Sequence, residues 1–206
     1  MQTVTPSLTQ LPVMEQFYTL QGEGYFQGEA AYFIRLGGCD VGCHWCDVKE
    51  SWDASQWPLV EVSSLVAEAS KHPASIVIIT GGEPLMYPLG TLTKALRDAG
   101  KRVHIETSGA HPLSGDWDWI TLSPKKFKAA TQSVIDHADE LKVIIFNKSD
   151  FEFAEEYAAK IPNDCLLYLQ PEWSKREEVL PLMVEYVKQN PRWRIGLQNH
   201  KYINIP

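Results

Sequence analysis

The sequence predicts a mixed α/β protein with a mostly parallel sheet covered by helices. Segments with the apolar pattern of buried strands alternate with segments of helical periodicity between residues 30 and 198. Such β–α repetition needs crossover connections between parallel strands. An open doubly wound sheet and a full or partial barrel both fit this pattern, although 206 residues is short for a closed eight-fold barrel.

The predicted strands are β-rich apolar runs that end in polar or glycine-rich residues. They lie at 30–38, 75–80, 102–109, 118–125, 140–146, 165–171 and 193–198. The run "SIVIIT" at 75–80 has no polar alternation until Thr80, which is typical of a parallel strand buried on both faces.

The predicted helices have apolar residues at spacings of three and four. They lie at 62–72, 89–100, 149–160 and 175–190. Gly100 is a C-terminal stop for the second helix. Ser149 and Glu152 occupy capping-box positions at the start of the third, and Pro181 lies inside the fourth.

Composition and charge narrow the class of function. The sequence has no internal repeat or linker, so we expect a single domain over residues 1–206. A formal net charge of −7 argues against a nucleic-acid partner. No apolar run approaches the roughly 20 residues of a membrane helix, and the N-terminal stretch lacks the pattern of a signal peptide. A cytoplasmic protein without a membrane partner is the expectation, and disulfides are rare in that compartment.

Polar motifs stand at the carboxyl ends of six predicted strands. These motifs are "RLGGC", "ITGGEP", "IETSG", "LSPKK", "LQPEW" and "LQNHK". In parallel α/β folds ligands bind at that edge of the sheet. We therefore expect six segments that are distant in the sequence to converge on one site.

Three of the four cysteines, Cys39, Cys43 and Cys46, lie within eight residues with the spacing Cys-x3-Cys-x2-Cys. A structural zinc site needs four protein ligands, and His44 is poorly placed between two of the cysteines. A c-type haem needs histidine after the last cysteine, where Asp47 stands. Ordinary ferredoxin clusters use four cysteines. Three thiolates on a four-iron cluster leave one iron free for a substrate or cofactor, and thiolate suits iron–sulfur clusters.

This spacing, with Trp45 directly before the last cysteine and "GGEP" after the next strand, resembles the cluster motif of radical S-adenosylmethionine (SAM) enzymes. The resemblance implies a [4Fe-4S] cluster on Cys39, Cys43 and Cys46. It also implies SAM bound to the open iron and cleaved to a 5′-deoxyadenosyl radical.

Motifs at both ends of the chain narrow the resemblance. "FYTLQGEGYFQGEAAYFIRLGGC" and "RWRIGLQNHKYINIP", with "CHWCD", "TGGEP", "ETSG" and "SPK" between them, are similar to the 7-carboxy-7-deazaguanine synthase family from about Glu15 to the last residue. That family implies a partial barrel and a homodimer. It implies a lyase that converts 6-carboxy-5,6,7,8-tetrahydropterin by hydrogen abstraction at C6, ring contraction and loss of ammonia, in queuosine and 7-deazapurine biosynthesis.

The resemblance also implies roles for individual residues. Those on the substrate side are Leu20, Gln21, Gly22, Glu23, Arg35, Thr80, His200 and Pro206, whose terminal carboxylate reaches the substrate in this family. Those on the SAM side are Trp45, Asp47, Gly81, Gly82, Glu83, Glu106, Ser108, Ser123, Pro124, Lys125 and Gln170. A planar guanidinium such as Arg35 suits a carboxylate.

One position departs from the family pattern. Val48 stands where the family has a threonine whose hydroxyl binds Mg²⁺. Valine offers no oxygen to a hard cation. Mg²⁺ is then either held by substrate and water or dispensable. The usual electron donor of the family is a flavodoxin.

Two other functions remain open from the sequence. A radical SAM activating enzyme, which places a glycyl radical on a partner protein, shares the cysteine spacing but has no reason to carry the "QNHKYINIP" tail. A structural metal-binding or regulatory module without activity is the second, although three ligands make a poor structural site.

Overall fold

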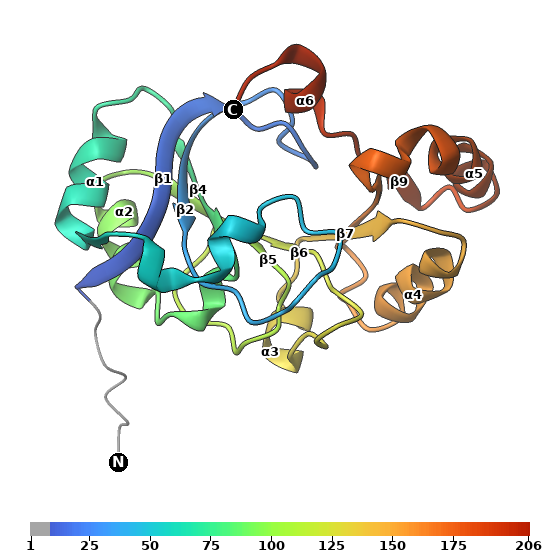
Figure 1. The fold of residues 1–206 in the computed structure, drawn as a ribbon, viewed down its shortest axis with the longest axis horizontal. Helices are drawn as coiled ribbons and strands as arrows, with labels where there is room; N and C mark the ends of the chain where they lie inside the picture. Colours follow the sequence, from blue (N-terminus) through green and yellow to red (C-terminus); the bar gives the residue numbers. More distant parts are fainter. Residues whose placement is uncertain (1–8) are drawn as a thin grey trace.

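A computed structural model describes residues 9–206 of the protein. In this part of the chain nine strands form one sheet in the order β3-β1-β2-β4-β5-β6-β7-β8-β9 (Figure 1). The strands are β1 Gln10–Leu20, β2 Ala30–Leu36, β3 Leu59–Glu61, β4 Ile76–Gly81, β5 Arg102–Thr107, β6 Trp119–Leu122, β7 Glu140–Ile145, β8 Leu166–Pro171 and β9 Trp193–Ile195. The helices are α1 Val62–Ser70, α2 Gly90–Asp98, α3 Gln132–Ile135, α4 Ser149–Ala158, α5 Arg176–Gln189 and α6 Asn199–Ile203, and short 3-10 helices lie at Lys49–Trp52, Ala54–Gln56, Pro84–Met86 and Trp173–Lys175.

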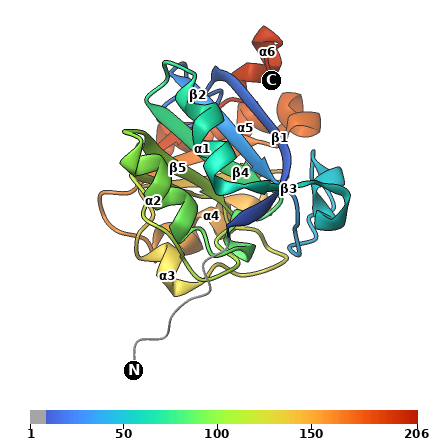
Figure 2. The ribbon, with the colours of Figure 1, turned by 90° about the vertical axis from the view of Figure 1, so that its left-hand side faces the viewer.

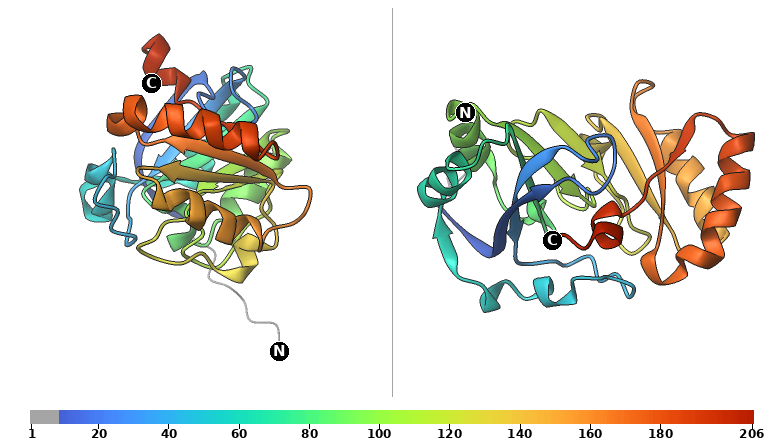
Figure 3. Two further views of the ribbon diagram at one scale, coloured as in Figure 1. Left: turned by 90° about the vertical axis from the view of Figure 1, so that its right-hand side faces the viewer. Right: turned by 90° about the horizontal axis from the view of Figure 1, so that it is seen from above.

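The sheet is a partial barrel. Every neighbouring pair from β2 to β9 is parallel, whereas β1 pairs antiparallel with both β2 and β3. Its two edges are β3 and β9, so the sheet curves without closing (Figure 3). The predicted incomplete barrel of mostly parallel strands with outer helices is confirmed, and a closed barrel is excluded.

The two faces of the curved sheet differ in chemistry because successive side chains of a strand point to opposite faces. The helices cover the outer face, with α1 and α2 over one half and α4 and α5 over the other (Figures 2 and 3). Ile105 of β5 and Leu141 of β7 belong to the main apolar core on that side. Their neighbours Glu106 and Lys142 point into the concave side, which is therefore polar.

Seven strands and four helices occur where the sequence predicts them, with ends that differ by a few residues. Pro181 lies inside α5, as predicted. The prediction omitted β1, β3, α3 and α6. No helix among residues 9–206 is long and apolar enough to cross a membrane. The expectation that the N-terminus lacks a signal peptide falls partly on residues 1–8, outside the described residues.

The predicted capping box at the start of α4 is wrong. The N-cap is Lys148, and no side chain caps the helix there. The Ser149 hydroxyl instead donates to Asn147 Oδ1 at 2.8 Å. Asp150 Oδ2 accepts from the Asn147 backbone N–H at 2.8 Å. The turn before the helix therefore takes the Ser149 hydroxyl that the capping box required.

Candidate active site

A pocket of about 310 Å³ lies on the concave side of the sheet, at the carboxyl ends of the parallel strands. All six polar strand ends contribute to it, which confirms that these segments converge. Members of these segments in the lining are Cys39, Thr80, Glu106, Ser123, Gln170 and Gln198. The volume is in the range of a small-molecule site.

The structure brings most of the predicted site residues to this pocket. The predicted substrate residues in its lining are Leu20, Gln21, Gly22, Glu23, Arg35, Thr80, His200 and Pro206. The predicted SAM residues in its lining are Trp45, Asp47, Gly81, Gly82, Glu106, Ser108, Ser123, Lys125 and Gln170. Glu83 and Pro124 are not among the lining residues.

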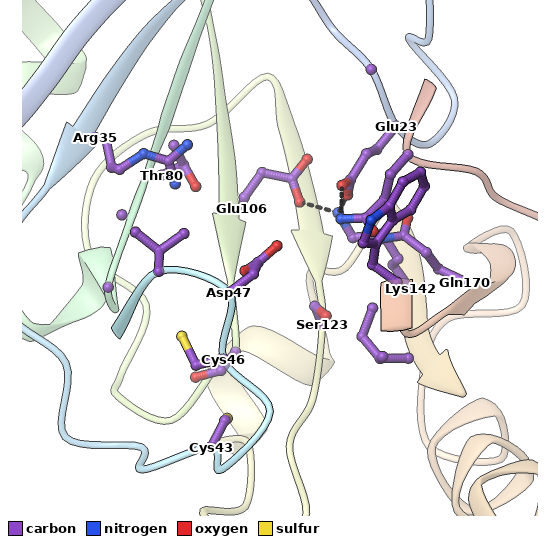
Figure 4. Close-up of a pocket in the computed structure, with 18 of the residues that line it drawn as sticks. Glu23, Arg35, Cys43, Cys46, Asp47, Thr80, Glu106, Ser123, Lys142 and Gln170 are labelled. Carbon is purple, nitrogen blue, oxygen red and sulfur yellow. Dashed lines mark hydrogen bonds and ion pairs between the residues drawn. The ribbon is translucent and has the colours of Figure 1, made fainter. Parts of the chain in front are cut away.

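The three clustered cysteines line the pocket, and Figure 4 shows Cys43 and Cys46 at one end of it. All three are free thiols, and they pack against one another and against Val41 and Ala110. Burial raises the pKa of Cys39, and it raises the pKa of Cys43 to about 11. Three soft donors gathered in a partly apolar recess fit an iron–sulfur cluster, whose positive iron atoms would stabilise the thiolates.

The donor set does not suit a single metal ion. Within residues 9–206 no group of three or more His, Cys, Asp or Glu side chains is arranged to hold one ion. Thiolates on a cubane cluster bind different iron atoms, so they need not converge on one point. The cysteine loop therefore fits a cluster better than a lone zinc or magnesium ion.

The glycines of the "GGEP" turn bring this turn against the cysteine loop. A Cβ built on Gly82 would lie 2.2 Å from the Gly38 carbonyl oxygen and 2.8 Å from Cys39 Cβ. Gly81 has φ +149, and a Cβ there would lie 2.2 Å from the Leu36 carbonyl oxygen. Only glycine permits so close an approach. At these two positions the pocket wall beside the cysteines therefore consists of backbone atoms.

Glu83 of the same turn has a structural role in this conformation. Its side chain is 1% exposed and accepts from the Thr107 hydroxyl at 2.6 Å, the Ser108 N–H at 2.8 Å and the Leu85 N–H at 3.0 Å. The Ser108 hydroxyl also donates to it. Donors from β5 and the turn therefore occupy the carboxylate of Glu83, and Glu83 is not among the lining residues of the pocket.

Lys125, Ser123 and Gln170 are polar residues of the pocket lining. Lys125 Nζ donates to Ser123 Oγ at 2.6 Å and lies 5.5 Å from the centre of the Trp45 ring. Burial lowers the pKa of Lys125. Gln170 is 2% exposed, and its Oε1 is buried with no hydrogen-bond partner among the described residues. An unpaired buried acceptor fits a ligand that brings an N–H group.

A buried charge network forms the pocket wall beside Gln170 (Figure 4). Lys142 Nζ pairs with Glu23 at 2.6 Å and with Glu106 at 2.7 Å, and Gln21 Nε2 donates to Glu106 at 3.2 Å. The network links β5 and β7 to the loop after β1. Glu106, predicted on the SAM side, thus lies beside two predicted substrate residues, Gln21 and Glu23.

The shared lysine sets the ionisation of both carboxyls. Burial raises the pKa of Glu23, but the Lys142 charge and hydrogen bond outweigh burial and lower it to about 2. Burial raises the pKa of Glu106 above its ordinary value, although Lys142 opposes the shift. The pKa of Lys142 itself is raised, because its carboxylate neighbours outweigh burial. Glu23 is therefore an anionic acceptor at neutral pH.

Sequence reasoning missed Lys142. Its signal was a charged pair in "ELKVIIF", where Glu140 and Lys142 stand two residues apart in an otherwise apolar strand. Because successive side chains of a strand point to opposite faces, both residues lie on the same face of β7, which is the concave one.

Arg35 and Thr80 are register partners on β2 and β4, and both line the pocket. Arg35 Nε pairs with Glu15 Oε1 at 2.5 Å. This pair fixes the guanidinium from one side. A ligand carboxylate approaching end-on would pair with the two terminal nitrogens.

The C-terminal segment lies on the open side of the curved sheet (Figure 3), and Gln198, His200 and Pro206 of this segment line the pocket. The Asn199 N–H donates to the Gly22 carbonyl at 2.9 Å, and Gln198 Nε2 donates to Glu23 at 3.1 Å. His200 packs so closely on Gly22 that a Cβ there would lie 2.4 Å from His200 Nδ1. This segment therefore lies beside Gly22 and Glu23, two of the residues predicted on the substrate side.

Val48 lines the pocket with an apolar side chain. Its backbone carbonyl accepts from the Ser51 hydroxyl at 2.7 Å. The neighbouring Asp47 pairs with Lys201 of α6 at 3.0 Å. The oxygen atoms nearest in sequence to the family's magnesium position thus have protein partners.

Comparison with known proteins agrees with this site. The sequence model of the radical SAM superfamily matches residues 33–137. A 7-carboxy-7-deazaguanine synthase from Flavobacterium psychrophilum is 57% identical over 95% of this chain and 93% of its own length. One from Synechocystis is 48% identical over 94% of this chain and 93% of its own length.

A solved structure agrees with the fold. The crystal structure of QueE from Escherichia coli superimposes with a TM-score of 0.84 at 33% identity, covering 93% of this chain and 95% of that one. The match spans both chain ends as well as the cysteine motif, which neither the activating-enzyme nor the structural-module alternative predicts. The chain therefore belongs to the 7-carboxy-7-deazaguanine synthase family of radical SAM enzymes.

Proposed function

We propose that this enzyme converts 6-carboxy-5,6,7,8-tetrahydropterin into 7-carboxy-7-deazaguanine and ammonia. One observation carries the proposal: a single pocket is lined by the three cysteines, by the anionic Glu23 and by the cationic Arg35. Glu23 would accept the guanidine-type N–H groups of the pterin, and Arg35 would bind its carboxylate. The terminal carboxylate at Pro206 would close the substrate side.

The cluster and SAM, when bound, supply the one-electron chemistry that starts the reaction. Cys39, Cys43 and Cys46 would hold the cluster. Trp45, Asp47, Gly81, Gly82, Ser108, Ser123, Lys125 and Gln170 are the lining residues proposed to hold SAM. The roles of Glu83 and Pro124 in this proposal are indirect, through the shape of their turns.

An anaerobic assay tests the proposed function. The reconstituted enzyme is given SAM, a reductant and the carboxytetrahydropterin, and the products are identified by mass spectrometry. The wild type and Cys165→Ala, which removes a cysteine outside the pocket, are expected to form the deazaguanine. Cys43→Ala is expected to form none. A fully reconstituted wild type that yields no deazaguanine would overturn the proposal.

We further propose a weak dependence on Mg²⁺. Val48 offers no oxygen, so any Mg²⁺ would rest on substrate and water. Titration of Mg²⁺ into the wild type and Val48→Thr is expected to stimulate the variant more strongly. Val48→Ala, which also lacks a hydroxyl, should respond like the wild type. Identical responses of wild type and Val48→Thr would show that position 48 is not a metal ligand in either form.

We also propose a cytoplasmic homodimer reduced by a flavodoxin. The free clustered cysteines favour a reducing compartment. The dimer and the electron donor rest on family membership alone. Size-exclusion chromatography with light scattering and turnover with reduced flavodoxin test these two points.

A further inference from the structure

A second, small cavity of about 10 Å³ lies directly behind the charged wall of the pocket. It shares Gln21, Glu23 and Glu106 with the main pocket, and Glu140 and Trp119 line its far side. A cavity of this volume is about the size that holds one water molecule. The two cavities thus meet at the residues that are proposed to bind the pterin.

Two buried polar atoms of this cavity's lining residues lack protein partners. Glu140 is 1% exposed, and its Oε1 has no hydrogen-bond partner within residues 9–206. Trp119 Nε1 is likewise buried and without a partner in that part of the chain. An indole N–H is only a donor, and a carboxyl oxygen accepts. One water between them would satisfy both, as buried waters commonly do.

The other oxygen of Glu140 holds the loop that follows β1. Oε2 accepts from the Tyr25 backbone N–H at 2.9 Å. Gly24 lies so close to Glu140 that a Cβ there would stand 2.3 Å from Oε1, and its φ of +66 suits glycine. Glu140 therefore contacts the loop from Gln21 to Tyr25 on the side away from the main pocket, while Gln21 and Glu23 face the pocket.

We propose, on the basis of the proposed function, that Glu140 is a positioning residue for substrate. Its protonated carboxyl, together with one water shared with Trp119, holds residues 21–25 in the pose that presents Gln21 and Glu23 to the pterin. Ionisation of Glu140 loosens this loop and weakens substrate binding.

The charges around Glu140 explain why the neutral form is the one that holds the loop. Three carboxyls, Glu23, Glu106 and Glu140, lie around a single ammonium, that of Lys142. Burial, followed by the charge of Glu106, raises the pKa of Glu140 to about 7. An ionised Glu140 would add a negative charge that no second cation compensates among these groups.

The remaining titratable groups near Glu140 do not supply that cation. Burial lowers the pKa of His104, which lines the same cavity, to about 4, so its ring is neutral at pH 7. Burial raises the pKa of the Cys165 thiol to about 12 and raises that of Asp139. Above pH 7 the wall behind the pocket therefore gains net negative charge. The Tyr25 N–H bond by itself favours the ionised carboxyl, but burial under the loop and repulsion from Glu106 outweigh it, so ionisation favours a conformation in which the loop moves away and water reaches Glu140.

Two substitutions at Glu140 separate the parts of this proposal. Glu140→Gln keeps an oxygen that accepts from Tyr25 but cannot ionise. Glu140→Ala removes the bond. In the wild type the KM for the pterin is expected to rise severalfold between pH 6.5 and pH 8.5, with a smaller change in kcat. In Glu140→Gln the KM should stay near the low-pH value, and in Glu140→Ala it should be raised roughly tenfold at every pH, as for one lost hydrogen bond.

Hydrogen–deuterium exchange gives a readout that needs no turnover. The peptide over residues 20–28 of the reconstituted enzyme is followed by mass spectrometry at the same pH values. Its exchange is expected to be fast in Glu140→Ala and slow in Glu140→Gln. In the wild type it should rise more steeply above pH 7 than in Glu140→Gln, since both share the intrinsic pH dependence of exchange.

Two further variants complete the test. Glu152→Gln, an exposed position on α4, should match the wild type in KM and exchange. Trp119→Phe removes the second partner of the water but keeps an aromatic ring beside Tyr25 and Phe26, and it should speed exchange of residues 20–28 less than Glu140→Ala does. Equal pH profiles of the wild type and Glu140→Gln, or unaltered exchange in Glu140→Ala, would overturn the proposal. If the wild type forms no deazaguanine, the proposed function fails, and the exchange data still decide whether Glu140 holds the loop.

Discussion

Lys142 is the residue on which the charged wall of the pocket depends. It lies on a buried strand, is 5% exposed and bridges Glu23 to Glu106. A buried ion pair is costly to break, because the remaining partner keeps its charge without its counterion. Here two carboxylates share that dependence, and one of them is a proposed substrate acceptor.

Lys142→Met should therefore weaken both stability and substrate binding. It keeps most of the side-chain volume but leaves Glu23 and Glu106 unpaired, so we expect a loss on the order of 3–5 kcal/mol in the free energy of unfolding. The loss should shrink at low pH, where the carboxyls are protonated. Urea denaturation and pterin binding measure the two effects. Lys188→Met, at an exposed pair on α5, is the control and should change stability by less than about 1 kcal/mol. Equal stability of the two variants would contradict this account.

At the scale of elements, α6 and the residues after it connect the two sides of the pocket. The segment binds the loop after β1 through Gly22 and Glu23, and it reaches the cysteine loop through the Lys201–Asp47 pair. The Asp47 side chain of that pair is 62% exposed, so water and salt screen the interaction. The hydrogen bonds to Gly22 and Glu23 therefore fix the segment more firmly than the ion pair does.

Deletion of Pro206 tests the contribution of the last residue. Because Pro206 lines the pocket, shortening the chain would move the terminal carboxylate away from the substrate side. We expect the KM for the pterin to rise roughly tenfold or more, with a smaller change in SAM affinity. Pro206→Ala keeps a carboxylate at the same position in the chain and should stay close to the wild type. An unchanged KM in the deletion would rule out a substrate contact.

At the scale of the whole molecule, one sheet separates an apolar layer from a polar one. The outer face packs on the helices in a continuous core, while the concave face holds Glu140, Lys142, Glu106 and His104. Burying so many titratable groups makes folding depend on pH wherever a pKa differs between the folded and unfolded states.

Glu140 should make the wild type lose stability as pH rises from about 5 to 8. Its pKa in the folded protein, about 7, lies above the ordinary 4.5, so the folded state favours the neutral form. That stabilisation is complete below pH 4.5 and is lost as pH rises through 7. Glu140→Gln cannot ionise, so its free energy of unfolding should gain on the wild type over this range by at most about 3 kcal/mol. Urea denaturation at several pH values measures the difference. A difference that is constant with pH would contradict the assignment.

The positions of the main strands and helices were predictable because they follow local patterns. Apolar runs such as "SIVIIT" and helical stripes such as that of α2 depend on neighbouring residues only. The strand β1 was not predicted, since it alternates weakly and gains its place by pairing antiparallel with β2. The capping box failed for a related reason: Asn147 Oδ1 accepts from both the N–H and the hydroxyl of Ser149, which are groups that the box would have used.

The residues of the candidate site likewise divide into those that a local sequence pattern predicts and those that it does not. Cys39, Cys43 and Cys46 were found as candidate cluster ligands because they lie close together in the chain. Lys142 and Glu140 were missed because their partners come from other strands and loops, at separations that no local pattern records.

The sequence alone determined seven of the strands and four of the helices, the three candidate cluster ligands and the six polar strand ends, because each depends on residues near one another in the chain. The tertiary structure decided where the side chains at those ends point. In the folded protein the Glu83 carboxylate accepts from β5, and Lys142 joins Glu23 to Glu106. Glu140 accepts from the backbone of the loop formed by residues 21–25. Those outcomes depend on burial and on which charges meet across the sheet, and both arise only when distant segments fold together.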